Sequence, residues 1–169
     1  MADDRLVLDA VDVVVEVPKG SRNKYEYDRA SGRLRLTGRL QTPAGYPAEY
    51  GFIPMTLSAD GEPLDAIVLL EEPTFPGCLI ETRPVGLLPT LDDSGYEPKV
   101  ICVPLDEPSW DGVFDIAQVP DSWLSVVRAF FETYKDDTPD RWSAAGSFGD
   151  AAEAHRLIAG CRERCVSAT

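Results

Sequence analysis

The feature that most constrains the fold is a series of short segments separated by Gly/Pro turns over the first two-thirds of the chain. The segments VDVVVEVP, NKYEYD, GRLRL, YGFIP, DAIVLLEE, CLIETRPVGLL and KVICVPL are β-branched or alternate in polarity, which is typical of strands. The turn signals SG, DGEP, FPG and DDSG fall between them. Short strands at this spacing predict a closed or partly closed β-barrel.

The last third of the chain changes to the period of helices. The segment PDSWLSVVRAFFETYKD predicts an amphipathic helix with Asp121 or Ser122 as its N-cap. Its apolar side carries Trp123, Val127, Phe130, Phe131 and Tyr134. A second helix is expected over DAAEAHRLIAGCRERC, although Gly160 costs it about 1 kcal/mol. The predicted fold class is α+β, a single domain of residues 1–169 with two helices packed outside a barrel.

Charge excludes two classes of partner. The chain has 29 Asp and Glu against 16 Lys and Arg, a formal net charge of −13, whereas nucleic acid and anionic membranes require a surplus of basic residues. The N-terminus MADDRLVLDA lacks the basic and apolar regions of a secretory signal. No apolar run approaches the roughly 20 residues that span a bilayer. We therefore expect a soluble cytoplasmic protein.

The cysteines and the histidine favour structural roles. Cys78 and Cys102 lie in apolar strand-like segments, and Cys161 and Cys165 lie four residues apart on the second predicted helix. The sole histidine, His155, is six residues before Cys161, which leaves too few ligands for a soft-metal site. We interpret the four as reduced structural thiols rather than as a metal or redox site, and the histidine as a surface residue rather than a catalytic base.

The turn DGEPLD places Asp60, Glu62 and Asp65 within six residues. These carboxylates repel one another unless their charge is compensated, and no basic residue lies between Thr56 and Arg83. If the segment is extended, Asp60 and Glu62 face the same way. Either the turn is solvated, as many acidic turns are, or a cation binds to it.

A second acidic turn, DDSGYEPK, carries Asp92, Asp93 and Glu97 beside Lys99. Mg²⁺ takes oxygen ligands and is commonly held by a few carboxylates together with substrate phosphates. Two acidic turns at the ends of neighbouring strands would build one site for several such ions.

A further group of residues offers donors to phosphate oxygens. The donors are the ammonium groups of two lysines and the hydroxyl groups of three tyrosines, and one carboxylate lies next to them in the sequence. These residues are Lys24, Lys135, Tyr46, Tyr50, Tyr134 and, as the carboxylate, Glu26. An acidic protein that binds a polyanion needs metal ions as the bridge and carboxylates to hold them. The two sets of residues together predict a metal-dependent phosphoryl hydrolase.

The runs VEVPKGSRNKYEYD, YPAEYGFIPMTLSADGEPLDAIVL, RPVGLL, DDSGYEPKVICVP and FFETYKD are colinear with, and similar to, the soluble family I inorganic pyrophosphatases of prokaryotic type. The resemblance covers nearly the whole chain. It implies a five-stranded OB-like β-barrel flanked by two α-helices, dependence on Mg²⁺, hydrolysis of pyrophosphate to two phosphates and, in bacteria, a homohexamer.

The resemblance also implies roles for individual residues. It implies metal ligands at Asp60, Asp65, Asp92 and Glu97. It implies phosphate contacts at Lys24, Tyr50, Lys99, Tyr134 and Lys135, with Glu62, Tyr50 and Lys99 closest to the chemistry. It implies supporting groups at Glu16, Glu26 and Tyr46, of which the last two have the alternative of being merely buried.

Three positions depart from the pattern of the family. Glu62 and Glu97 stand where the family has Asp, and each extra methylene moves a carboxylate by roughly 1.5 Å, a displacement that can cost about a hundredfold in rate. Gly38 falls where the family has a phosphate-binding Arg, a contact worth roughly 1.5–3 kcal/mol. Arg39 replaces that Arg only if a bulge at Gly38 turns its side chain toward the site.

Three functional hypotheses follow. The first is hydrolysis of pyrophosphate with Mg²⁺, or with Mn²⁺ if the longer Glu side chains change the metal preference. The second is a diverged hydrolase for another phosphorylated substrate or an organic diphosphate, since Gly38 leaves room for a substituent. The third is a catalytically weak or silent homologue that binds pyrophosphate or metal.

Overall fold

The alternation along β1 (Val11–Val17) decides which face of the barrel wall is buried. Its odd-numbered valines, Val11, Val13, Val15 and Val17, are at most 3% exposed, whereas the residues between them are not buried. A period of two is what a strand shows when one face packs in a core. The structure is a computed structural model that describes residues 10–135 and 139–169.

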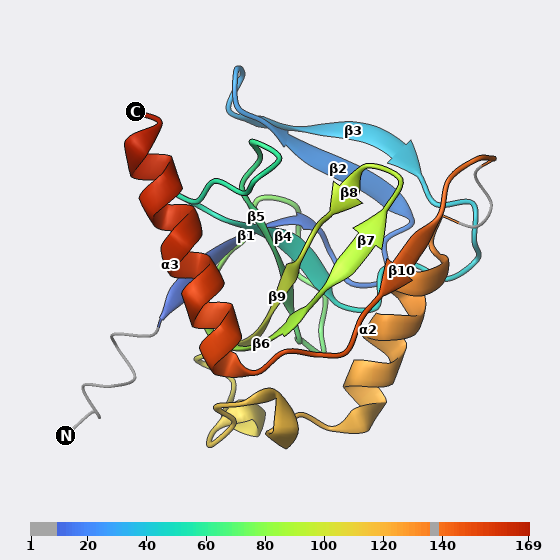
Figure 1. The fold of residues 1–169 in the computed structure, drawn as a ribbon. Coiled ribbons are helices and arrows are strands. Elements are labelled where there is room, and N and C mark those ends of the chain that lie inside the picture. Colours follow the sequence, from blue (N-terminus) through green and yellow to red (C-terminus); the bar gives the residue numbers. More distant parts are fainter. Residues whose placement is uncertain (1–9, 136–138) are drawn as a thin grey trace.

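Five strands close into a barrel in the order β1–β4–β5–β9–β6 and back to β1, as Figure 1 shows. The other four strands are β4 (Glu49–Ile53), β5 (Leu64–Val68), β6 (Leu79–Leu88) and β9 (Lys99–Pro104). The predicted five-stranded barrel is therefore confirmed. Closure leaves no open edge on which another chain could add a strand.

One pair of barrel strands is parallel. Strand β5 pairs with β9 in a register that sets Ala66 opposite Val100, whereas the other four pairs of the barrel are antiparallel. A parallel pair cannot be joined by a tight turn, and β6, β7 and β8 lie between β5 and β9 along the chain. The two acidic turns, which precede β5 and β9, thus meet at the same end of the barrel.

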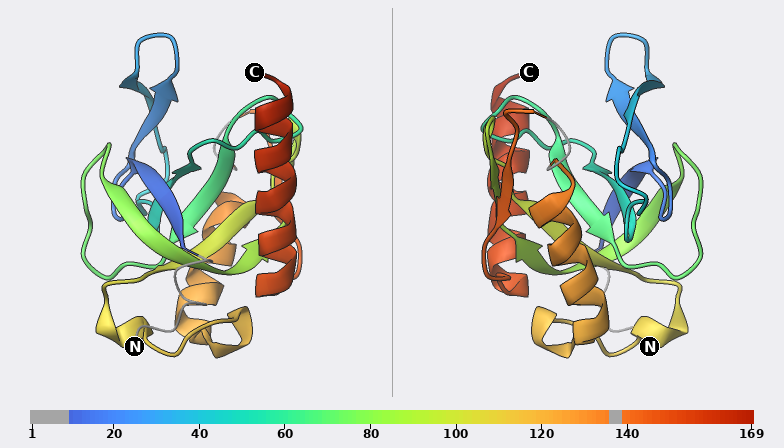
Figure 2. Two further views of the ribbon diagram at one scale, coloured as in Figure 1. Left: turned by 90° about the vertical axis from the view of Figure 1, so that its left-hand side faces the viewer. Right: turned by 90° about the vertical axis from the view of Figure 1, so that its right-hand side faces the viewer.

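The remaining strands form two small sheets outside the barrel. Strands β2 (Asn23–Asp28) and β3 (Arg33–Arg39) form a hairpin, which projects beyond the barrel in Figure 2. The sequence predicted both as strands, and their separation agrees with the exposure of most of their residues. The sheet β10–β7–β8 comprises Ser143–Ala145, Thr90–Asp92 and Gly95–Tyr96, none of which sequence analysis predicted as a strand.

Helix α2 (Asp121–Thr133) packs its predicted apolar side on the barrel. Val127, Phe130 and Phe131 are buried in the core. The predicted cap was wrong, because Pro120 is the N-cap and no side chain caps the helix. Asp121 is instead the first helical residue, where its charge favours the positive end of the helix dipole. Two 3₁₀ turns precede it, η1 (Pro108–Trp110) and η2 (Ile116–Gln118).

Helix α3 (Ala151–Ser167) covers another side of the barrel (Figure 1). It begins at a capping box in which Asp150 and Glu153 each accept a backbone N–H of the other. Gly160 does not interrupt it. All four cysteines are free thiols, and Cys102 and Cys161 are buried. Neither described helix is long and apolar enough to cross a membrane.

The loop between β4 and β5 is held from both sides. Its Leu57 donates its N–H to the carbonyl of Cys161 on α3 at 2.9 Å and accepts from Arg164 Nη1 at 2.7 Å. The buried hydroxyl of Thr56 donates to the carbonyl of Ile53 and accepts from the N–H of Leu64. The loop carries the acidic turn, so these bonds fix where its carboxylates lie.

We predict that Thr56→Val lowers the free energy of unfolding by about 1–3 kcal/mol, because it leaves a buried N–H and a buried carbonyl without their partner. Thr56→Ser keeps the hydroxyl and is the matched control. Urea unfolding of the three proteins measures the difference. Equal stability of the Val and Ser variants would show that the hydroxyl does not anchor the loop.

Candidate active site

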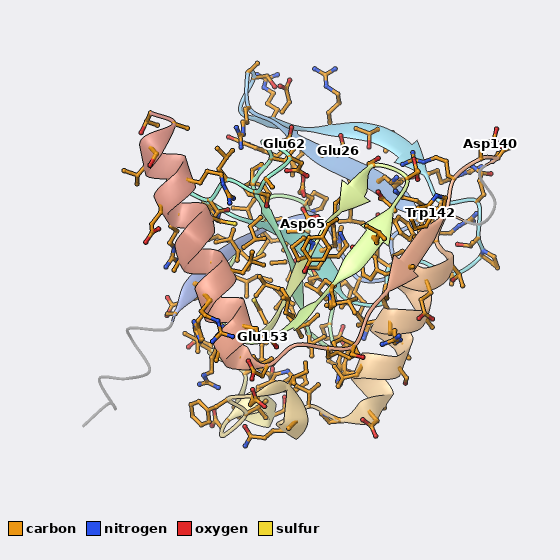
Figure 3. The ribbon with its side chains drawn as sticks, viewed as in Figure 1. Glu26, Glu62, Asp65, Asp140, Trp142 and Glu153 are labelled. Carbon is orange, nitrogen blue, oxygen red and sulfur yellow. The ribbon has the colours of Figure 1, made fainter. Side chains whose placement is uncertain are left out.

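A cavity of about 480 Å³ opens among the β2–β3 hairpin, strands β1, β4 and β5, and the C-terminal end of α2. Most residues predicted for the site line it, namely Glu16, Lys24, Glu26, Tyr46, Tyr50, Asp60, Glu62, Asp65, Glu97, Tyr134 and Lys135. The other two, Lys99 and Asp92, bond directly to lining residues. Figure 3 shows Glu26, Glu62 and Asp65 together between the hairpin and the barrel. The tertiary fold thus brings all the predicted residues to one place.

Glu16 reaches the cavity because it alternates with the buried valines of β1. Its side chain points away from the core and accepts the N–H of Tyr27 at 2.7 Å. Tyr27 belongs to β2 and packs against Phe52 of β4 in a tilted arrangement with ring centroids 5.2 Å apart. This carboxylate therefore ties the hairpin to the barrel wall.

The parallel register places an acid beside a base. Because Ala66 lies opposite Val100, the preceding residues Asp65 and Lys99 are neighbours across the same strand pair. Their side chains form an ion pair of 3.1 Å between Nζ and Oδ2. A residue 34 positions away thereby supplies the positive charge that the sequence around the first acidic turn lacks.

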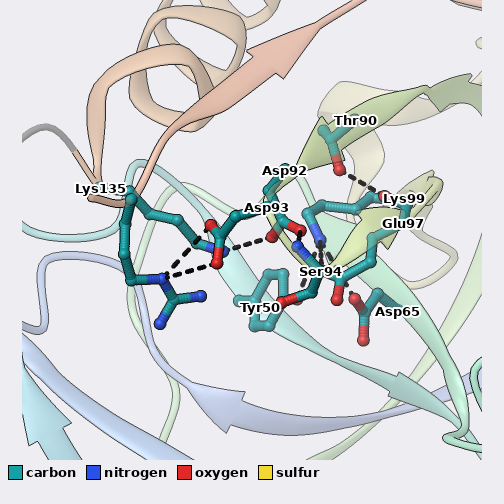
Figure 4. A network of polar contacts seen from close by, with 10 residues as sticks. Tyr50, Asp65, Thr90, Asp92, Asp93, Ser94, Glu97, Lys99 and Lys135 are labelled. Carbon is teal, nitrogen blue, oxygen red and sulfur yellow. Dashed lines mark hydrogen bonds and ion pairs between the residues drawn. The ribbon is translucent and has the colours of Figure 1, made fainter.

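Lys99 is the centre of a buried network, shown in Figure 4. Besides its bond to Asp65, its ammonium donates to Tyr50 Oη at 3.2 Å and lies 3.8 Å from Oε2 of Glu97. It also lies 5.3 Å from the ring centroids of Tyr50 and Phe131. The side chain is only 2% exposed, so the loss of a partner would leave a buried charge uncompensated.

The first acidic turn is a tight turn rather than an extended segment. Asp60 Oδ1 accepts the N–H of Glu62 at 2.9 Å, and Gly61 between them has a φ of 86°. The alternation of an extended strand therefore does not apply to these two carboxylates. Both line the cavity nonetheless, because the turn itself stands at its edge.

The acidic end of the cavity carries more negative charge than Lys99 offsets. Burial raises the pKa of Glu16 to about 7, with further contributions from the charges of Asp65, Glu26 and Glu62, against a lowering by the bond from Tyr27. The smaller part of the rise, which comes from the neighbouring carboxylates, is the part that a bound cation would offset.

The donor set at this end fits a hard divalent cation in kind. Asp60, Glu62, Asp65 and Glu97 contribute only oxygen ligands to one cavity, which is the chemistry that Mg²⁺ takes. Among the described residues, no three candidate ligands already stand close enough to hold one ion. The Lys99 ammonium now lies against two of these carboxylates, so a metal would have to share or displace that contact.

The other end of the cavity is cationic. Lys135 contacts the buried carboxylate of Asp92, and Asp93 lies 3.9 Å from Lys135 and 3.2 Å from Nε of Arg141. Burial lowers the pKa of Lys24; Glu26 acts in the opposite sense, and the charges of Lys135 and Arg141 lower it further. The three cations are therefore close enough to repel one another.

The three predicted tyrosines of the site keep their hydroxyl protons and can act as hydrogen-bond donors. Burial, followed by nearby negative charge, raises the pKa of Tyr46, Tyr50 and Tyr134 well above the ordinary value of a phenol. Their hydroxyl groups therefore stay protonated at neutral pH and can donate to a phosphate oxygen.

Known proteins match this chain closely. The sequence model of the family described as "Inorganic pyrophosphatase" matches residues 13–166. The inorganic pyrophosphatase of Leifsonia xyli is 46% identical over 149 residues, which are 88% of this chain and 91% of that protein. The crystal structure of the Thermus thermophilus inorganic pyrophosphatase superimposes with a TM-score of 0.89 at 40% identity, covering 93% of this chain and 91% of that one. The Helicobacter pylori enzyme gives 0.90 at 36% identity, covering 93% and 94%.

The chain belongs to the inorganic pyrophosphatase family. Both the family match and the structural match extend over nearly the whole chain, which agrees with the resemblance of the sequence motifs. The pyrophosphatase fold comprises the same closed barrel and two helices.

A predicted metal ligand and a predicted phosphate-binding residue form an ion pair with each other. Asp92, implied as a metal ligand, contacts Lys135, implied as a phosphate contact. The bond from Lys135, with those from Ser94 and Gly95, lowers the pKa of Asp92 against the opposing effect of burial. Asp92 therefore stands ionised, and it would bind a metal only after Lys135 turns to another anion.

Sequence reasoning missed several lining residues. The polar ones are Tyr25, Tyr27, Ser94 and Arg141. The two tyrosines alternate with Lys24 and Glu26 on β2, so the period of a strand places them on the opposite face, and only the tertiary structure shows that they also line the cavity. Arg141 follows the predicted helix in an irregular segment, and only the tertiary structure shows that it faces the cavity.

The structure also tests the proposed rescue by Arg39. A bulge is present, because the register passes from Tyr25↔Leu36 to Lys24↔Gly38 and leaves Thr37 without a partner. Arg39 itself is exposed opposite Asn23 and is not among the residues that line the cavity. The bulge therefore does not bring this guanidinium into the site.

We predict a pH-dependent gain in stability for Glu16→Gln. Because the folded-state pKa of about 7 exceeds the ordinary 4.5, the contribution of Glu16 to stability is full below about 4.5 and is lost as the pH rises through about 7. The neutral Gln has no such loss, so its stability relative to wild type should rise between about pH 5 and about pH 8.

Urea unfolding in EDTA measures this difference, with Asp12→Asn, an exposed acid on the same strand, as the control. A difference between Glu16→Gln and wild type that stays constant with pH would contradict the raised pKa.

Proposed function

We propose that this member of the pyrophosphatase family hydrolyses inorganic pyrophosphate to two phosphates in a Mg²⁺-dependent reaction. The observation that carries the proposal is the division of one cavity into a carboxylate end and a cationic end, in a chain of net charge −13. Pyrophosphate is a small polyanion, so lysine and arginine can bind one part of it while metal ions bridge the other part to the carboxylates.

Family membership and the donor set both support metal ions as cofactors. We assign the ligands to the two acidic turns and the start of β5, with Asp60, Asp65, Asp92 and Glu97 as the set. Bound metal ions would lower the pKa of water and neutralise charge on the phosphate oxygens. Mn²⁺ is the alternative to Mg²⁺, because Glu97 is a longer ligand than Asp.

The side chains of the site would provide proton transfer and the hydrogen bonds to the phosphate oxygens. We assign to Glu62, which lines the cavity from the first acidic turn, the role of accepting the proton of the attacking water. Lys24, Tyr134 and Lys135 donate to the phosphate oxygens. Tyr50, whose hydroxyl is already bonded to Lys99, donates with that lysine to the charge that develops on the leaving group.

Three residues support this set without the same contact to substrate. Glu16 holds the hairpin that carries Lys24 and Glu26. Tyr46 lies against Tyr50 with ring centroids 5.6 Å apart, which limits the rotamers that Tyr50 can adopt. Glu26 shares the cavity with Glu16 and adds to the negative charge that a metal ion would offset.

An organic diphosphate is the second candidate substrate, and the space at Gly38 favours it. A Cβ atom at this position would meet nothing within 4 Å. Gly38 lies opposite Lys24 across the hairpin, so a substituent on one phosphate would find room beside that lysine.

We also propose a homohexamer in the cytoplasm, with each subunit a single pyrophosphatase domain. Exposed large apolar side chains support an oligomer, among them Leu36, Met55, Phe75, Leu79 and Val166, each at least 59% exposed. A chain of this charge gives no support for nucleic acid or membrane partners.

We predict that the wild-type protein releases phosphate from pyrophosphate in Mg²⁺, and that Asp65→Asn lowers kcat/KM by about a hundredfold or more, because it removes a ligand and the partner of Lys99. Asp12→Asn is the matched control. Glu62→Asp and Gly38→Arg restore the residues typical of the family. Arg fits at position 38 without backbone strain, because Gly38 does not have a positive φ.

Release of phosphate only from a substituted diphosphate would instead establish the second candidate. Wild-type protein that is inert toward every diphosphate and is activated by Glu62→Asp with Gly38→Arg would show a family scaffold that has lost the activity.

Metal removal gives a test that does not depend on turnover. We predict that Mg²⁺ raises the melting temperature and that EDTA reverses the rise, because a ligand at 100 times its Kd adds about 2.7 kcal/mol to stability. Asp60→Asn should weaken the effect. A melting temperature that responds to neither Mg²⁺ nor EDTA would count against a metal site at these turns.

A further inference from the structure

We propose that Arg141 binds a phosphate group of the substrate and provides the guanidinium that position 38 does not. The inference rests on the proposed function, since it assigns a substrate-binding residue of the same site. Among the described residues that line the cavity, Arg141 is the sole arginine. It comes from the segment between α2 and β10, opposite the carboxylate end.

The position of Arg141 is set by an acid from the second acidic turn. Its Nε lies 3.2 Å from Oδ2 and 3.3 Å from Oδ1 of Asp93. The same carboxylate lies 3.9 Å from Nζ of Lys135. Asp93 is therefore a positioning residue that holds two cations on one side of the cavity.

The geometry leaves donors of Arg141 for a ligand. A guanidinium has five N–H donors in a fixed fork, and the contact with Asp93 uses the one on Nε. In the described part of the chain, no group accepts a bond from either Nη. With its side chain 41% exposed, the fork stands at the rim, where it can bind two oxygens of one phosphate.

The charges around Arg141 also point to an anion. Lys24, Lys135 and Arg141 line the same cavity, and their mutual repulsion is evident in the lowered pKa of Lys24, after burial as the larger cause. The neighbouring acids Asp92 and Asp93 offset this charge in part. A polyanion that entered among the three cations would relieve their repulsion, and the fork would fix its orientation.

Position 38 cannot provide a guanidinium to the cavity, and neither does the neighbouring residue Arg39. Gly38 has no side chain, and Arg39 is exposed outside the cavity. Arg141 approaches from a different element, so its guanidinium reaches the phosphate from another side. The space beside Gly38 then stays open to water or to a substituent of the substrate.

Binding of imidodiphosphate, a non-hydrolysable analogue of pyrophosphate, tests the assignment by calorimetry in Mg²⁺, alongside KM and kcat with pyrophosphate. We expect Arg141→Ala to raise the Kd and KM by about 10- to 100-fold, the range of one charge-assisted contact. Arg141→Lys should fall between, because it keeps the charge and loses the fork. Arg39→Ala is the matched control and should change neither constant.

A rescue experiment separates binding from a structural role. If Arg141 supplies the missing contact, Gly38→Arg added to Arg141→Ala should recover most of the lost affinity. An unchanged Kd in Arg141→Ala would overturn the inference. So would a lower melting temperature and kcat without a rise in Kd, since that is the signature of a group that only holds β10 in place.

The two readouts also separate this inference from the proposed function. A wild type that binds imidodiphosphate through Arg141 but does not cleave pyrophosphate would retain the inference and refute the function. If instead the wild type cleaves pyrophosphate and Arg141→Ala cleaves it equally well, the proposed function stands and the inference about Arg141 is refuted. A wild type that binds neither compound would overturn both.

Discussion

Parallel pairing of β5 with β9 is the constraint on which the site depends. It sets Asp65 beside Lys99 at the same end of the barrel and brings both acidic turns to one cavity. The Lys99 ammonium, 2% exposed, then bonds Asp65 and Tyr50 and approaches Glu97. A buried cation of this kind adds little net stability, so its value lies in the geometry that it imposes on the acids around it.

Sorting of charge within the cavity explains how so acidic a protein can act on a polyanion. The carboxylates of Asp60, Glu62 and Asp65 gather at one end, where the pKa of Glu16 rises to about 7. Lysines and Arg141 gather at the other end, restrained by acids of the β7–β8 turn. A metal ion would offset the charge of the first end and a phosphate that of the second, so a metal-bound diphosphate would offset both together.

Internal ion pairs join the acids and the lysines around the cavity. Lys99 occupies the place of a cation between Asp65 and Glu97, and Asp92 occupies the place of an anion beside Lys135. Binding of a metal-bound diphosphate by these residues would have to loosen both pairs. Buried charges are costly to leave unpaired, so such an exchange would have to give each charge a new partner.

A feature of the fold or of the site was predictable from the sequence when it depends on residues that are close along the chain. It was not predictable when it depends on residues that meet only in the folded structure. The valines of β1, the apolar side of α2 and the two acidic turns follow from local periodicity and composition, and the family resemblance named residues that the fold gathers in and beside one cavity. The predicted N-cap of α2 was wrong because the backbone of Pro120, rather than a side chain, decides where that helix begins. The Asp92–Lys135 contact, the bulge at Thr37 and the place of Arg141 were not accessible.

The sequence by itself determined the barrel strands, the β2–β3 hairpin, the two helices and the kinds of donor that the site contains, because these depend on side-chain period and chemistry within short windows. Only the tertiary structure decided which charge faces which. Coulomb energy depends on distance and burial, and residues such as Asp65 and Lys99, 34 positions apart, become neighbours only when the barrel closes.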